Sequence, residues 1–367
     1  MEECRKTLCT FSGLAMVKKG IKVNEKGIIL VAVIKDVAKL AGVSVGTVSK
    51  YLNTPELLRE DKRAAVEDAI QKLNYKPNLF ARNLRVQDSK TIAVIAQEIR
   101  NPFHAALFNT IRKEAMKYNY SVVLYSLNDI NGNFDTLFET LPIHYFSGVI
   151  SCYFHDMEQS IDFAKRHSKV PMVIMTNSER YFDEYDSEKI VHADFTQGIQ
   201  KVCEYLISLG NTRIAYIGCR TKDQLRDPKL KGFMLTMEKH RLEPHSIVRL
   251  EKEYTMQTGY ESAEQILRSG QLPDAILSDT DVMSIGVLNC LRNHGIQVPD
   301  DIMLASFDNI EQAEYCNPRL TTLNVPIEAM SVKAVELLVA QMENRECKNT
   351  GNAFELELII RETTKNR

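Results

Sequence analysis

Residues 34–53 combine small, polar and apolar side chains at an informative spacing. Val37 and Ala41 recur at helical spacing, which predicts a short helix with one apolar face. Gly42 follows where this helix would end, and Ser44 can cap a second helix through its side-chain oxygen. Two short helices joined by a tight turn form a helix-turn-helix, whose second helix lies in the DNA major groove. The segment therefore predicts a DNA-binding head.

A third helix has to support these two. Apolar residues such as Val66 and Leu73 give residues 59–74 an amphipathic pattern. From Ile34 to Lys90 the chain has eleven Lys or Arg and seven Asp or Glu, although its net charge is −2. A basic head on an acidic body suits nucleic-acid binding at one end.

After residue 90 the pattern changes to apolar strands that alternate with helices. We expect strands at 92–96, 121–125, 148–150, 170–175, 213–218, 275–277 and 302–306, and helices at 105–118, 196–209, 259–268 and 283–294. This alternation predicts an α/β fold, with parallel sheets covered by helices on both faces. The strands are too many for one small sheet, so we expect two similar lobes with a ligand cleft between them.

The composition excludes several classes of protein. The chain has 367 residues, of which 44% are hydrophobic and 26% charged, as in a soluble globular protein of about two or three domains. No apolar run approaches the roughly 20 residues of a membrane span, and no secretory signal is visible. The eight cysteines lack metal-type spacing. Cys203, Cys219 and Cys290 lie in apolar stretches, which predicts buried thiols in a reducing cytoplasm. We find no nucleophile elbow, no phosphate-binding glycine loop and no metal motif, and therefore expect no catalytic residue, metal or cofactor.

Residues 1–32 differ from the rest of the chain and allow two interpretations. They contain Lys/Arg clusters without a clear period, as in a disordered basic arm that adds non-specific DNA affinity. Alternatively they are not native. The codons of Glu25, Lys26 and Gly27 would resemble a ribosome-binding site, and Val31 follows at a fitting distance for a GTG start. We favour the second interpretation.

The chain as a whole resembles the lactose/galactose repressor (LacI/GalR) family of bacterial transcription regulators. The resemblance runs from about Val33 to Thr364 and is strongest in the helix-turn-helix, in 73–84, and in 306–310 with 318–322. It implies a helix-turn-helix domain at 33–77, a hinge helix and linker at 78–89, and a two-lobed, periplasmic-binding-protein-like domain for effector binding and dimerisation at 90–367. Lobe 1 would comprise about 90–189 and 327–346, and lobe 2 about 190–326 and 350–367. No leucine heptad follows, so we expect a homodimer.

The resemblance also implies roles at the DNA end. Base readout falls to Val45, Gly46 and Lys50, although Lys50 has the alternative of a phosphate or solvent contact. Phosphate contacts fall to Ser44, Thr47, Ser49, Asn53 and Tyr75. Arg59 and Lys62 stand where the family commonly has Ser and Thr. They can still reach phosphate, but they remove a helix cap and raise the salt dependence of binding.

In the hinge, Asn78, Ala81 and Leu84 match the family pattern in register. Leu84 falls at the leucine that enters the minor groove and kinks the duplex, and the alternative is packing under the sensor domain. Ala81 is small enough for two hinge helices to approach closely.

The effector contacts implied by the resemblance come from four segments. Asn101, Phe103 and His104 match the Asn-Pro-aromatic-aromatic element, with His104 in place of the second aromatic. This histidine either contacts the effector or caps a helix at the surface. Lys229 stands where the family usually has Arg, while Thr176 and Asn177 stand where it often has Asp and Arg. Asp281 follows a strand and is expected to bind sugar hydroxyls.

These residues predict a cytoplasmic, homodimeric repressor of a metabolic, carbohydrate operon. It would bind double-stranded operator DNA and respond to a sugar or sugar phosphate in the cleft. Two alternatives remain: a regulator controlled by a protein co-regulator of the catabolite-control type, and a solute-binding protein without DNA function. The absence of an export signal and the hinge pattern disfavour the second.

The hinge assignment makes a direct prediction. Leu84→Ala should weaken binding to the specific operator and leave most binding to random DNA, because only the kinked complex uses the leucine. Fluorescence anisotropy on both duplexes at one salt concentration would measure this. Equal loss on random DNA would contradict the minor-groove role.

Overall fold

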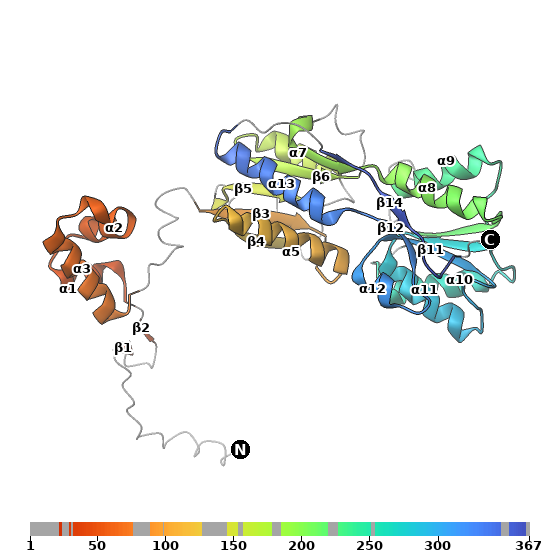
Figure 1. The fold of residues 1–367 in the computed structure, drawn as a ribbon, viewed down its shortest axis with the longest axis horizontal. Coiled ribbons are helices and arrows are strands. Elements are labelled where there is room, and N and C mark those ends of the chain that lie inside the picture. The colour runs from red at the N-terminus through yellow and green to blue at the C-terminus, as the bar shows by residue number, and fades with distance from the viewer. Residues whose placement is uncertain are drawn as a thin grey trace, which may run out of the picture. The chain divides into compact units, whose positions relative to one another are not determined.

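A computed structural model of the chain describes residues 22–23, 29–30, 32–75, 89–97, 99–126, 145–152, 157–177, 185–218, 227–250, 254–345 and 352–364. The chain forms two compact units, residues 1–86 and 87–367 (Figure 1). Within the expected leader, β1 (Lys22–Val23) pairs antiparallel with β2 (Ile29–Leu30).

The first unit contains a three-helix head. Its helices are α1 (Ile34–Ala41), α2 (Val45–Asn53) and α3 (Glu60–Leu73), with a 3₁₀ turn η1 (Pro55–Leu57) after α2. Gly42 ends α1 at a φ of 64°, the left-handed conformation that lets the chain turn directly into α2. A small core joins the helices and consists of Val37, Ala38, Val48, Val66, Ala69 and Tyr75.

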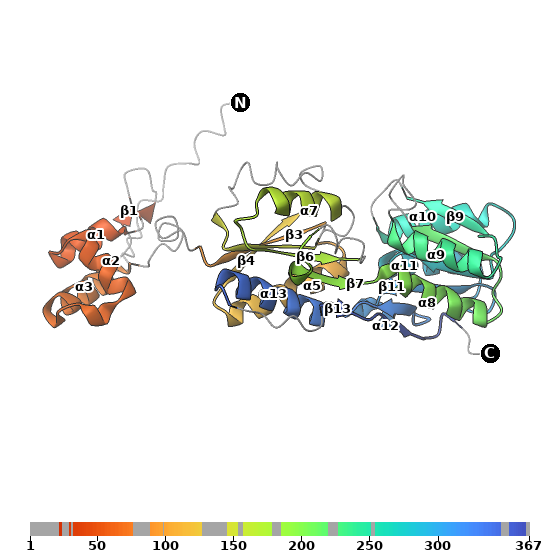
Figure 2. The ribbon, with the colours of Figure 1, turned by 90° about the horizontal axis from the view of Figure 1, so that it is seen from above.

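Lobe 1 of the second unit is built on an all-parallel sheet of order β13-β7-β6-β5-β3-β4. Its strands are β3 (Thr91–Ala96), β4 (Ser121–Ser126), β5 (Gly148–Ser151), β6 (Met172–Thr176), β7 (Ile190–Ala193) and β13 (Ala353–Phe354). Along β3, Ile92 and Val94 join one hydrophobic core while Ala93 and Ile95 join another. Both faces are therefore buried: α5 (Pro102–Lys117) and α13 (Ile327–Met342) cover one, and α7 (Met157–Arg166) covers the other (Figure 2).

Lobe 2 is built on a sheet of order β14-β12-β11-β10-β8-β9. Its strands are β8 (Ile214–Gly218), β9 (Ser246–Arg249), β10 (Ala275–Ser278), β11 (Met303–Asp308), β12 (Thr321–Asn324) and β14 (Glu357–Ile359). Helices α8 (Phe195–Ser208) and α9 (Pro228–Lys239) pack as one pair, and α10 (Met256–Leu267) and α11 (Asp281–Asn293) as another. The short helices η5 (Ser187–Lys189) and α12 (Glu311–Tyr315) complete the described elements.

The second helix pair makes an unusually close contact. A Cβ added at Gly286 would lie 1.9 Å from the Met256 carbonyl oxygen, and one at Gly259 would lie 2.1 Å from that of Met283. Only glycine permits this backbone approach, which holds the N-terminus of α11 in place beside the strand ends.

The structure confirms the α/β fold class and refines its details. β14 runs antiparallel to β12, because the chain enters it without a crossover helix. β7 and β13 pair within the lobe 1 sheet, so the chain crosses to lobe 2 after Ala193 rather than after residue 189. Several helices begin up to three residues before the expected position, since polar side chains cap them, as Asn101 caps α5 and Thr255 caps α10.

Two composition-based expectations can be compared with the described residues. Cys203 and Cys290 are buried free thiols, as predicted, whereas Cys219 lies outside these residues. Within the described helices, none is both long and apolar enough to cross a membrane.

Candidate DNA-binding surface and effector site

The recognition helix α2 is fixed at its N-terminus by its own side chains. The Thr47 N–H donates to Ser44 Oγ at 3.1 Å, and the two hydroxyl oxygens lie 2.9 Å apart. Val48 is fully buried in the head core and Val45 packs half-buried against it. Val45 is therefore a packing residue as well as a predicted base contact.

The outward face of α2 carries Gly46 and Lys50, which are both exposed and four residues apart. A Cβ added at Gly46 would meet only Ser44 Oγ, at 3.6 Å, which is ordinary contact. The fold therefore does not require a glycine there, and the position is open for a longer side chain.

Arg59 and Lys62 lie exposed at the start of α3. Arg59 is the N-cap and its side chain makes no capping hydrogen bond, as the loss of a Ser or Thr predicts. Glu60 and Asp61 occupy the first turn instead, where a negative charge stabilises the helix dipole.

The remaining predicted DNA contacts are placed unevenly. Tyr75 is 9% exposed and belongs to the head core, and burial raises the pKa of its hydroxyl. Its packing role was missed from the sequence, where it was assigned only to phosphate. Ser49 is half-buried on α2, whereas the side chain of Asn53 and residues Asn78, Ala81 and Leu84 lie outside the described part.

At the sensor end, Asn101 caps α5. Its Oδ1 accepts the Phe103 N–H at 3.0 Å, a structural role that accompanies its predicted effector contact. His104 is 8% exposed, so it does not cap a helix at the surface. Its ring packs edge-on against Phe103, with centroids 5.2 Å apart. Burial, and then the charge of Lys229, lower the pKa of His104 to about 4, so the ring is neutral at physiological pH.

Lys229 lies in the first turn of α9. Its Nζ donates to the Asp279 carbonyl oxygen at 2.7 Å and sits 3.8 Å from the centroid of the Phe307 ring. Phe195 lies at 5.4 Å on the same ammonium. The cation is thus held by a carbonyl and two aromatic faces, which is a stabilising environment away from water.

Asp281 is fully buried and fully engaged within the protein. Its Oδ1 accepts the Thr322 hydroxyl at 2.7 Å, and its Oδ2 accepts the Ile310 N–H at 2.9 Å. Burial raises the pKa of this carboxyl to about 6 despite these bonds. The structure therefore gives Asp281 a bracing role between α11, β12 and the residues after β11.

Asp308, at the end of β11, has the opposite character. It is 5% exposed, and its Oδ2 has no hydrogen-bond partner. Burial raises its pKa well above the usual range, although Lys229 opposes this. Its φ of 119° is rare for a residue with a side chain, and such backbone strain concentrates at functional sites.

The sequence offered a signal for Asp308 that we did not use. Ser306–Ile310 was noted as a family signature, but its carboxylate received no role. Asp227, Asp279, Tyr254, Phe195 and Phe307 were also missed. They surround Lys229 only because the α9, α10 and β11 segments meet in the fold. Thr176 and Asn177 are buried at the end of β6, where the Phe195 N–H donates to the Asn177 carbonyl oxygen at 3.2 Å.

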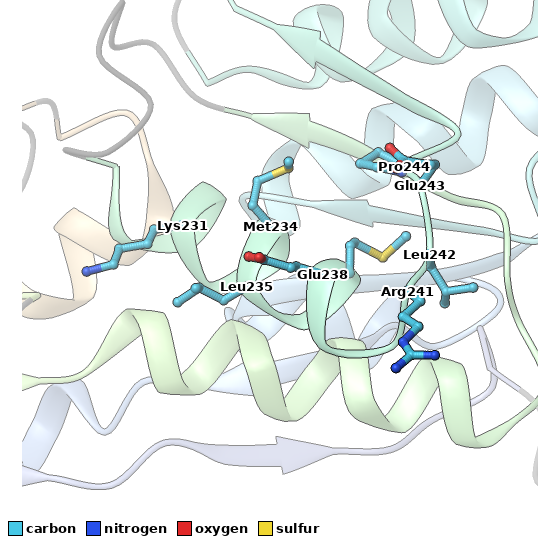
Figure 3. Close-up of a pocket in the computed structure, with 9 residues that line it drawn as sticks. Lys231, Met234, Leu235, Glu238, Arg241, Leu242, Glu243 and Pro244 are labelled. Carbon is cyan, nitrogen blue, oxygen red and sulfur yellow. The ribbon is translucent and has the colours of Figure 1, made fainter.

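A separate hollow of about 660 Å³ runs along α9 and the loop after it (Figure 3). Its lining includes the partly exposed Met234 and Leu235, and none of the predicted effector residues. No buried unpartnered polar atom belongs to the described residues of this lining, so the hollow lacks the features of the Asp308 site.

Comparison with known proteins identifies the two units. Residues 33–78 match the family described as bacterial regulatory proteins, lacI family, and residues 203–364 match a periplasmic binding protein-like domain. The chain belongs to the LacI family. It is 29% identical over 339 residues to the probable HTH-type transcriptional repressor ExuR of Bacillus subtilis, covering 90% of this chain and 98% of that one.

Other relatives agree with this assignment. The HTH-type transcriptional repressor PurR of Vibrio parahaemolyticus is 28% identical, covering 91% of this chain and 99% of that one. The fold matches that of a Lac repressor dimer bound to operator and the anti-inducer ONPF, with a TM-score of 0.75, 23% identity, and coverage of 91% and 99%. The LacI-family chain is thus a DNA-binding transcriptional regulator, and members of its family are not enzymes.

The buried carboxyls of this LacI-family chain predict a distinctive pH dependence. A raised folded-state pKa means that the folded protein holds a proton which the unfolded chain releases near pH 4, so stability is lost as pH rises through the folded pKa. Asp308→Asn should match the wild type at about pH 4 and exceed its free energy of unfolding at neutral pH. Urea titrations from pH 4 upward would measure the difference.

The matched control is Glu238→Gln, which removes an exposed carboxyl on α9. It should follow the wild type at every pH. If Asp308→Asn also follows the wild type throughout, the carboxyl of Asp308 is not neutral in the folded protein.

Proposed function

We propose that this chain is a cytoplasmic, homodimeric repressor of a carbohydrate operon, which binds a two-fold symmetric operator and is controlled by a small sugar-type ligand in the sensor. The observation that carries the ligand site is the pair of buried, unpartnered atoms Asp308 Oδ2 and His104 Nδ1. Unpaired polar groups in a folded interior are costly, and a ligand hydroxyl would satisfy both. Ligands of α/β sheets also bind outside the carboxyl ends of strands, where Asp308 lies.

The names of solved relatives support this class of ligand and assembly. A structure with a TM-score of 0.62 and 24% identity, covering 90% of this chain and 99% of that one, is a CelR–cellobiose complex, and the Lac repressor structure is a dimer bound to operator. A comparable arrangement here would place two heads on two operator half-sites.

Within this proposal, Asp308 is the carboxyl that contacts the effector, while Asp281 braces the site. We expected the contact from Asp281. Its oxygens, however, already accept hydrogen bonds from Thr322 and Ile310, whereas one oxygen of Asp308 has no partner. Thr176 and Lys229 complete the proposed pocket.

The effector acts through its different affinity for two states of the dimer. A ligand that bonds both His104 of lobe 1 and Asp308 of lobe 2 binds best when the lobes present these atoms together. It can change operator affinity only by that difference, which in known allosteric proteins corresponds to about 5- to 150-fold.

At the DNA end, Lys50 should provide base recognition. Lys50→Ala should weaken operator binding by about 1–3 kcal/mol and affect random DNA little, because a guanine contact exists only on the specific site. Lys72→Ala removes the same charge from the far end of α3, where Lys72 pairs with Asp68 at 2.7 Å, and is the matched control. Competition binding at one salt concentration separates the two. A uniform loss on all sequences would assign Lys50 to phosphate.

At the sensor end, the protein should bind the promoter DNA beside its own gene, and one sugar of a panel should change that affinity. Asp308→Leu should abolish the response and keep ligand-free operator binding, since it removes only the unpartnered carboxyl. Asp281→Ala should instead lower the free energy of unfolding by more than about 2 kcal/mol, because it leaves two buried donors unpaired.

Anisotropy titrations and urea denaturation together decide between the two carboxylates. Loss of the response in Asp281→Ala at unchanged stability would return the contact to Asp281. Specific binding that no compound alters would favour a protein co-regulator, and no specific binding would contradict the DNA head.

A further inference from the structure

The two unpartnered atoms of the sensor come from different lobes and lie under one charge. His104 belongs to α5 of lobe 1, and Asp308 ends β11 of lobe 2. The ammonium of Lys229 acts on the titration of both residues, so the three groups share one region of the domain. Each of the two side chains is more than nine-tenths buried.

Both groups are uncharged, and each can donate as well as accept a hydrogen bond. Burial keeps the imidazole of His104 deprotonated and the carboxyl of Asp308 protonated. A neutral imidazole has one donor and one acceptor nitrogen, and a carboxylic acid has a hydroxyl and a carbonyl oxygen. A ligand hydroxyl has the same dual capacity, so it can pair with either group in either direction. An anionic group only accepts and loses its hydration on entry.

The surrounding charges oppose an anion. Asp279 is buried, and its carboxylate accepts the Tyr216 hydroxyl at 2.5 Å and the Tyr254 hydroxyl at 3.2 Å. Asp281 and Asp227 are also buried, and the strongest charges acting on Asp308 are Lys229, Asp281 and Asp279. Among these, one cation faces several carboxyls.

The single cation is also already engaged. Lys229 donates to the Asp279 carbonyl oxygen and lies against the Phe307 ring. Its charge therefore compensates the buried carboxyl cluster, and an entering phosphate or carboxylate would compete with groups that already hold it.

We propose that the effector of this chain is an uncharged polyhydroxylated compound, with one hydroxyl bonded to His104 and another to Asp308, and that phosphorylated and carboxylated sugars are excluded. This inference rests on the proposed function and narrows its ligand class. It makes His104 a specificity-determining residue of this chain.

The test uses full-length protein and matched triples of sugars: a neutral hexose, its 6-phosphate and its uronic acid, with neutral disaccharides added. Thermal unfolding is followed for each compound at the same concentration. We expect a neutral compound to raise Tm and its charged partners to bind at least about tenfold more weakly, since they leave a buried charge unmatched. A charged member that stabilises more than its neutral parent overturns the inference.

Variants then test the two contacts. His104→Phe keeps the aromatic ring and removes both nitrogens, and should weaken the neutral ligand by at least about tenfold, because its hydroxyl loses its partner. His240→Phe, at the C-terminus of α9, is the matched control and should change nothing. Asp308→Asn should retain binding, since an amide also donates and accepts. Loss of binding in Asp308→Asn would show an ionised carboxyl in the complex and contradict the inference.

Failure of the inference and failure of the proposed function give different results. A charged compound that both binds and alters operator affinity leaves the effector-controlled repressor intact and overturns only the neutral ligand class. If no compound changes Tm or operator affinity, the small-ligand control itself is contradicted, and with it the inference.

Discussion

The bracing of Asp281 is the interaction on which the sensor site depends. One carboxylate receives the Thr322 hydroxyl from β12 and the Ile310 N–H from the segment after β11, and it stands at the first turn of α11. These bonds fix three segments against one another in a place where water is absent, so each bond is stronger than it would be at the surface. The position of Asp308, two residues before Ile310, follows directly from this anchor.

The two carboxyls illustrate how one fold separates support from recognition. Asp281 spends its hydrogen-bonding capacity inside the protein, whereas Asp308 keeps an oxygen unpartnered on a strained backbone. Natural proteins satisfy nearly all buried polar atoms, and the exceptions concentrate at functional sites. The head shows the same division, because Val48 and Tyr75 hold its small core while Gly46 and Lys50 face outward.

Much of this arrangement follows from the sequence, and the rest depends on contacts between distant segments. The helical spacing of Val37 and Val66 and the strand alternation in 92–96 were sufficient for the head and the α/β sensor. Their signals are local periodicities, and the buried faces confirm them. The assignment of the effector carboxylate depended on which of two aspartates has its bonds filled by β12, and no local pattern contains that information.

The edges of the elements were also beyond local reasoning. β7 and β13 are short, and whether such a strand joins one sheet or the other depends on its partner and not on its composition. Tyr75 lies beside the turn that ends α3 and was read as a surface residue, yet its aromatic ring completes the head core.

The interleaving of the two lobes along the chain has a consequence for synthesis on the ribosome. α13, which covers β5, β6 and β7, comes after all of lobe 2 except β14, and Gly148 of β5 lies against Leu338 of that helix. Until residues 327–359 emerge, the lobe 1 sheet has one bare apolar face and both sheets lack an edge strand. A nascent or prematurely terminated chain would therefore expose apolar surface and unpaired strand edges, which are the features that chaperones bind and that drive aggregation.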